Sequence, residues 1–254
     1  MIQSVNRALD IMMCVSDNHG KPLTVSQIAA KTGLNQSTCC HIIETLTERG
    51  FLNKVSRSSG YVLGIYAYAL ARYRSYHRDL IDACSPILKW LQNKTGHTTL
   101  LTNLIDGEKF VLRYFDSPDN PLNERGELYR GSLYNTATGR AMLSSMKRNE
   151  LKAVVDKVGL PLQSEWENIS SFEQLYQKLA EVAKEPVVKL IDKDEQHYYC
   201  KLAVMFTGRK DEKFALGLEM KKKEVPEEKE IRLIEKNMLL AMKEIRRRIE
   251  FEKI

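Results

Sequence analysis

Apolar positions recur at helical spacing through the first 50 residues. Between about residues 5 and 15 they lie three and four positions apart, which predicts an amphipathic helix. A second, shorter helix is predicted over residues 25–31, because Thr24 and Gln27 have the types and spacing of a capping box. A turn containing Gly33 follows. A third helix is then predicted from Gln36 to about Arg49.

Two short apolar runs come next and flank the polar stretch NKVSRSSG, which predicts a short hairpin. The order helix, helix, tight turn, helix, hairpin is that of a winged helix-turn-helix. We expect this domain to occupy residues 1–64.

The third helix contains the adjacent triplet Cys39-Cys40-His41, which raises the possibility of a metal or nucleophile site. Cys39 belongs to a stripe of apolar residues at i, i+3, i+4 and i+7, so it is predicted to be a core residue, whereas Cys40 and His41 point outward. Adjacent helical residues lie about 100° apart, which argues against a shared metal ion. We therefore predict neither a metal site nor a catalytic site here.

The outward face of the third helix is small and hydrogen-bonding, which suits a helix that enters the major groove of DNA. A merely solvated face is the alternative. Residues 1–75 hold eight basic and four acidic side chains, so they are more basic per residue than the remainder. The predicted DNA contacts are Gln36, Ser37, Thr38, Cys40, His41 and Thr45, with Arg57 of the wing on the DNA backbone.

Beyond residue 64 the pattern alternates between helical and strand-like segments. A Tyr-rich connecting helix is predicted over residues 65–78, either packing within the chain or burying its rings against a partner chain. Pro86 is expected to bend or break the following helix. An Asp-Gly pair predicts a hairpin near residue 106, and two more strands are expected near residues 200 and 216. Helices are expected at 137–146, 150–158, 172–183 and from about 226 onward. Mixed elements in this order predict an antiparallel sheet with helices packed on it, over residues 79–254.

Composition narrows the class of protein. Apolar residues make up 43% of the 254, which is enough for a buried core. The apolar runs are far too short to cross a bilayer, and no signal peptide is evident, so a cytoplasmic protein is expected. Five cysteines without a CxxC pair predict neither a disulfide framework nor a zinc site.

Several segments resemble the IclR-type bacterial transcription regulators. The matching segments are SVNRALDIMMCV, LTVSQIAAKTGLNQSTCCHIIETLTERGFL and YVLGIYAYAL, with weaker similarity in NTATGRAML and CKLAV. The resemblance implies an α+β chain with an N-terminal winged helix-turn-helix, a connecting helix and a C-terminal GAF-like effector-binding domain. The chain departs from the family at His41, where Arg is usual, and at Ser132-Leu133-Tyr134, where the family has Pro-Leu-His.

An effector pocket is expected where SLYNTATGRAML enters its helix. Asn135 and Thr136 lie at a helix N-terminus, which favours a small anion, although residue types alone also fit an ordinary N-cap. The resemblance favours the pocket. Strand alternation predicts that Tyr198 and Cys200 share one face. A pocket-facing Glu219 would favour a polyol or a cation over a carboxylate. The predicted effector residues are Ser132, Asn135, Thr136, Tyr198, Cys200 and Glu219.

These features predict a ligand-responsive regulator that binds double-stranded DNA at a pseudo-palindromic operator as a homodimer or dimer of dimers, with a small polar metabolite as effector and no cofactor. One alternative is a DNA-binding scaffold whose second domain only dimerises, its pocket filled by side chains such as Tyr134 and Glu219. An enzyme is the other alternative. Its acid and base candidates are His97, Asp106, Glu195 and His197, which form no spaced motif.

Overall fold

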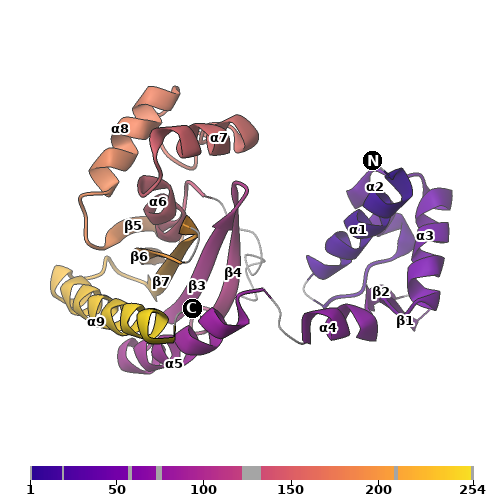
Figure 1. Ribbon diagram of the computed structural model, residues 1–254, viewed down its shortest axis with the longest axis horizontal. Helices are drawn as coiled ribbons and strands as arrows, with labels where there is room; N and C mark the ends of the chain where they lie inside the picture. Colours follow the sequence, from indigo (N-terminus) through magenta and orange to yellow (C-terminus); the bar gives the residue numbers. More distant parts are fainter. Residues whose placement is uncertain are drawn as a thin grey trace. The chain divides into compact units, whose positions relative to one another are not determined.

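The computed structural model describes residues 2–18, 20–56, 59–72, 76–121, 133–208 and 211–252. The chain divides into two compact units, Met1–Arg78 and Asp79–Ile254 (Figure 1). Each unit has its own hydrophobic core, so each is described by itself.

The first unit is a winged helix-turn-helix, as the sequence predicted. Its elements are α1 (Gln3–Ser16), α2 (Val25–Thr32), α3 (Gln36–Glu48), β1 (Leu52–Ser56), β2 (Gly60–Leu63) and α4 (Ile65–Arg72). The predicted capping box is present, since the Thr24 side chain accepts from the Gln27 backbone and the Gln27 side chain accepts from the Thr24 backbone. Gly33 ends α2 with a left-handed backbone (φ 69°), which lets the chain turn sharply into α3.

The core of the first unit contains the predicted inward stripe of α3. Cys39 and Ile43 are fully buried, together with Ile11 of α1 and Ile28 of α2. Cys39 is therefore a core residue, as expected. The helix that the sequence predicted as a connector, α4, packs within this unit, since the Tyr66 ring lies 6.1 Å from that of Phe51.

The second unit is built on a five-stranded sheet. Its strands are β3 (Thr98–Ile105), β4 (Glu108–Phe115), β5 (Val188–Lys193), β6 (Tyr198–Thr207) and β7 (Lys213–Lys222). They lie in the order β4-β3-β7-β6-β5, and every neighbouring pair is antiparallel. The predicted antiparallel sheet is confirmed. The edge strand β5 was not predicted.

Helices cover both faces of this sheet. They are α5 (Arg78–Thr95), α6 (Ala137–Ser144), α7 (Arg148–Val158), α8 (Phe172–Val182) and α9 (Glu228–Glu252). In Figure 1, α5 and α9 lie along one face, whereas α6 lies on the other with α7 and α8 beyond it. The first face holds the larger core, which includes Leu88 of α5, Met238 of α9 and Phe214 of β7.

One prediction about α5 was wrong in part, since Pro86 does not break the helix. A proline inside a helix costs about 3 kcal/mol, because it removes one backbone hydrogen bond and crowds the preceding turn. Fully burying one aliphatic side chain stabilises by about 1.5–3 kcal/mol. Residues on both sides of Pro86 are buried against the sheet, including Leu80, Leu88 and Leu91. Their packing outweighs the cost of the proline.

Candidate functional site

The outward face of α3 is the first candidate site. Asn35 caps the helix, since its Oδ1 accepts from the Thr38 backbone N–H at 2.8 Å. Burial of Cys39, Ile43 and Leu46 then fixes which side of the helix faces solvent. The outward side chains are therefore held in place by the core beneath them.

The predicted DNA-contacting side chains lie on this face. Gln36, Ser37, His41 and Thr45 are exposed, whereas Thr38 and Cys40 are half-buried. Gln36 Nε2 donates to Ser26 Oγ of α2 at 3.3 Å, which ties the start of α3 to the preceding helix. Arg57 lies outside the described residues.

The N-terminus of α6 is the second candidate site. Thr136 is the N-cap, and its Oγ1 accepts from the Gly139 backbone N–H at 3.3 Å and from Lys109 Nζ at 3.0 Å. Lys109 comes from β4 and is only 5% exposed. A lysine ammonium group is thus buried beside the positive end of a helix, where a cation is disfavoured unless an anion lies close by.

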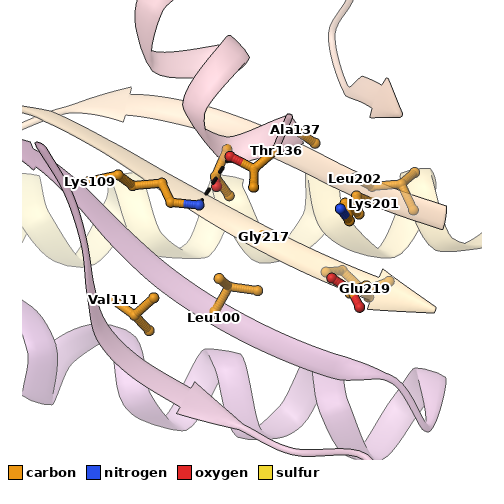
Figure 2. Close-up of a pocket in the computed structure, with 11 residues that line it drawn as sticks. Leu100, Lys109, Val111, Thr136, Ala137, Lys201, Leu202, Gly217 and Glu219 are labelled. Carbon is orange, nitrogen blue, oxygen red and sulfur yellow. Dashed lines mark hydrogen bonds between the residues drawn. The ribbon is translucent and has the colours of Figure 1, made fainter. Parts of the chain in front are cut away.

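Two further charged side chains, Lys201 and Glu219, line the hollow at this helix end (Figure 2). Lys201 of β6 donates to the backbone carbonyl of Asn135 at 3.3 Å and to Asp192 Oδ2 at 2.7 Å. Glu219 of β7 is 7% exposed and accepts from Asn120 Nδ2 at 2.9 Å. Two ammonium groups and one carboxylate therefore line the same hollow.

The floor of the hollow depends on a glycine. A Cβ at Gly217 would lie 2.7 Å from Thr138 Cγ2 and 3.0 Å from the Leu100 side chain. Glycine therefore allows the first turn of α6 to lie directly on β7. The remaining cavity has a volume of about 30 Å³. This volume holds about one water molecule, so a metabolite needs a side chain to move.

The predicted effector residues are only partly brought together. Thr136 and Glu219 line the hollow, and Asn135 lies beside it with an exposed side chain. Ser132 lies outside the described residues. Tyr134 is buried elsewhere, with its hydroxyl donating to the Gly159 carbonyl at 2.7 Å, so it does not fill the hollow.

Cys200 and Tyr198 need a correction. They share a face of β6, as alternation predicted, but it is the face opposite to α6. Cys200 is fully buried in the core formed by α5 and α9, and burial raises the pKa of its thiol to about 11. The residues of β6 on the α6 side are Lys201, Ala203 and Met205. The structure therefore separates Cys200 and Tyr198 from Thr136.

The acid and base candidates lie apart from the hollow. His97 Nε2 is 4.0 Å from Glu230 Oε1, and burial lowers the pKa of its imidazole. His197 lies 3.8 Å from Asp194 Oδ1 at the turn between β5 and β6. Within the described part of the chain, no group of three or more His, Cys, Asp or Glu side chains could hold a metal ion. Across the same residues, no helix is long and apolar enough to span a bilayer.

Comparison with known proteins identifies the architecture. Residues 4–56 match the IclR helix-turn-helix domain, and residues 74–245 match the bacterial transcriptional regulator IclR C-terminal domain. The chain belongs to the IclR family. This family consists of transcriptional regulators rather than enzymes, as the sequence predicted.

Individual IclR-family members share this fold at low sequence identity. The acetate operon repressor of Salmonella typhimurium is 22% identical over 161 residues, which cover 63% of this chain and 58% of the repressor. The chain thus spans less than two thirds of that curated relative. A crystal structure of an IclR transcriptional regulator from Alicyclobacillus acidocaldarius is 18% identical, with a TM-score of 0.73 over 96% of this chain and 98% of that one. An IclR homolog from Microbacterium hydrocarbonoxydans, complexed with 4-hydroxybenzoate, is 17% identical, with a TM-score of 0.74 over 96% and 99%.

Sequence reasoning missed the two lysines of the IclR-type C-terminal domain. Lys201 carried a detectable signal, because it interrupts the apolar run from Cys200 to Val204. Lys109 carried none, since a lysine two residues after an Asp-Gly turn is usually solvated. Its burial depends on α6, which is distant in the sequence.

Proposed function

We propose that this chain is a DNA-binding transcriptional regulator whose second unit binds a small anionic effector. The observation that carries the DNA-binding proposal is the outward face of α3 in a winged helix-turn-helix domain. Hydroxyl, thiol, imidazole and amide groups line that face above a fully apolar inner stripe. In a helix-turn-helix, such groups near the start of the second helix contact base edges in the major groove.

The chemistry of these residues suggests which part of the DNA each one contacts. Ser37, Thr38, Cys40 and His41 are proposed to contact base edges or phosphates. Arg57 of the wing is proposed to contact the DNA backbone without reading the sequence. Because one small winged domain touches few bases, we further propose that a homodimer or dimer of dimers binds a pseudo-palindromic operator.

The effector proposal rests on the electrostatics of the α6 N-terminus. An anion there would meet the positive end of a helix and the ammonium group of Lys109 together. The ammonium group of Lys201 lies on the same side. We therefore propose that the effector binds through a carboxylate. Glu219 considered alone had favoured a polyol or a cation instead.

Glu219, which accepts a hydrogen bond from Asn120, adds a second requirement for a ligand in the hollow. A carboxylate accepts hydrogen bonds and donates none, so it favours a hydroxyl or amino group on the ligand. Together these groups fit a small hydroxy acid. 4-Hydroxybenzoate, the compound in the structure of the Microbacterium homolog, has a carboxylate and a hydroxyl at opposite ends.

The small volume of the hollow favours a second candidate function. Lys109 extends to Thr136 and occupies the position proposed for the anion. If the side chain stays there, the second unit serves only for dimerisation and the chain is a DNA-binding scaffold. In the effector model, the ligand displaces the Lys109 side chain and then pairs with it.

Thermal stability of the full chain distinguishes the two functions. Hydroxy acids such as 4-hydroxybenzoate, lactate and gluconate should raise the Tm by mass action if one of them binds the native state. Replacing Lys109 by Met should weaken the binding of any hit about tenfold to a hundredfold, because a charge-assisted hydrogen bond is lost. Lys178→Met, which neutralises an exposed lysine of α8, should leave it unchanged. Absence of any Tm shift across the panel would favour the scaffold.

A further inference from the structure

Glu44 occupies the middle of the outward face of α3 and was not among the predicted DNA contacts. It lies three residues after His41 and four after Cys40, so the three side chains meet on one side of the helix. Its Oε1 accepts from Cys40 Sγ at 3.6 Å, and its Oε2 lies 3.5 Å from His41 Nδ1. Two predicted DNA-contacting side chains therefore hold one carboxylate between them.

The carboxylate remains available for a further partner. The Glu44 side chain is 60% exposed and that of His41 is 78% exposed. An ionised carboxylate offers about four acceptor positions, and the Cys40 thiol occupies one of them. Desolvation, followed by the hydrogen bond to Glu44, raises the pKa of the Cys40 thiol, so Cys40 remains a donor that orients the carboxylate.

A carboxylate in this place is costly for a helix that approaches DNA. Phosphate groups repel it, and this repulsion lowers the affinity for every sequence alike. A favourable contact with a base edge can offset the cost, and such a contact then depends on the sequence. The position of Glu44, one turn beyond His41 on the same stripe, is within the part of α3 that faces outward.

The chemistry of the carboxylate selects the base. In the major groove, guanine presents two acceptors and thymine presents an acceptor and a methyl group, so both repel a carboxylate. Adenine presents a donor next to an acceptor. Cytosine presents the N4 amino group, which is the usual partner of a glutamate in the groove.

We propose that Glu44 is a base-reading residue that selects cytosine at one position of each operator half-site, and that Cys40 and His41, besides their own proposed DNA contacts, orient its carboxylate. This inference rests on the proposed DNA-binding function. It concerns which base is chosen, whereas the proposed function requires only that α3 contacts the DNA.

Selection of bound sequences from randomised DNA by the full chain tests the proposal. The wild type should prefer cytosine over guanine at one half-site position by about tenfold or more. Glu44→Gln should shift that position toward adenine, because an amide donates and accepts and so matches the adenine edge. Glu48→Gln removes the same charge from the last residue of α3 and should retain cytosine at that position.

The outcomes separate this inference from the function on which it rests. If Glu44→Gln leaves the preference unchanged at every position, Glu44 does not read a base and the proposal is overturned. A uniform gain in affinity without a change of preference also overturns it, since Glu44 would then only repel phosphate. In both cases sequence-specific binding by the wild type would leave the regulator function intact. If the wild type selects no sequence at all, the proposed function fails as well.

Discussion

The outward face of α3 and the hollow at the N-terminus of α6 differ in how their polar groups are held. On α3, most of the polar side chains are exposed on a helix whose other side is buried, and packing of the buried side fixes the direction in which they face. At α6, Lys109, Thr136 and Glu219 are all buried and each already has a protein partner. Substitutions on the first surface should therefore change binding and little else. Substitutions in the second should change stability and binding together.

The largest expected effect comes from a substitution in the buried side of α3 rather than on its exposed face. Ile43 is fully buried in the first core, so Ile43→Ala should lower the free energy of unfolding by about 2–5 kcal/mol. Thr45→Ala on the exposed face should change it by less than about 0.5 kcal/mol. Urea unfolding of both variants measures this contrast. Equal losses would show that the inward and outward faces are wrongly assigned.

The next largest effect is expected at the close contact between Gly217 of β7 and Thr138 of α6, beneath the hollow. Gly217→Ala should destabilise the second unit by about 1–3 kcal/mol, because the added methyl meets Thr138 Cγ2 and the Leu100 side chain. Thr138→Ser removes Cγ2, so the double variant should recover part of the loss. Calorimetry of the single and double variants gives the coupling energy. A coupling of zero would mean that α6 does not lie on β7 as described.

The sequence predicted the outward face of α3 better than it predicted the hollow at α6. The inner stripe of α3 could be recognised because one side of the helix is buried and the other exposed, so periodicity carries the information. In β6 both faces are covered, and apart from Lys201 the run from Cys200 to Phe206 is apolar. Alternation could group Tyr198 with Cys200, but it could not tell which face met α6.

The missed features share a physical cause. The edge strand β5 has the sequence VKLIDK, in which charged residues dilute the strand pattern. The effect of Pro86 depended on packing of α5 against the sheet, and the burial of Lys109 depended on α6. Each is decided by tertiary contacts between segments far apart in the chain, which override local propensity.

The smallest effect concerns Arg57 in the wing. Replacing Arg57 by Ala should weaken binding to all DNA sequences alike and reduce the slope of log K against log salt by about one, because one phosphate contact is lost. Fluorescence anisotropy at several salt concentrations gives the slope. An unchanged slope, or a loss confined to one sequence, would assign Arg57 a different role.

The central claim is that the outward face of α3 reads DNA, and its most direct test is the sequence preference of the double variant Thr38→Ala with His41→Ala. Selection from randomised DNA should show that preference falls at one or more positions of each half-site, by about 1–3 kcal/mol for each lost base contact. The Tm of the first unit should stay close to that of the wild type, because His41 is exposed and the Asn35 cap uses the backbone of Thr38. Operator binding that survives with the same affinity and the same preferred sequence would contradict the account.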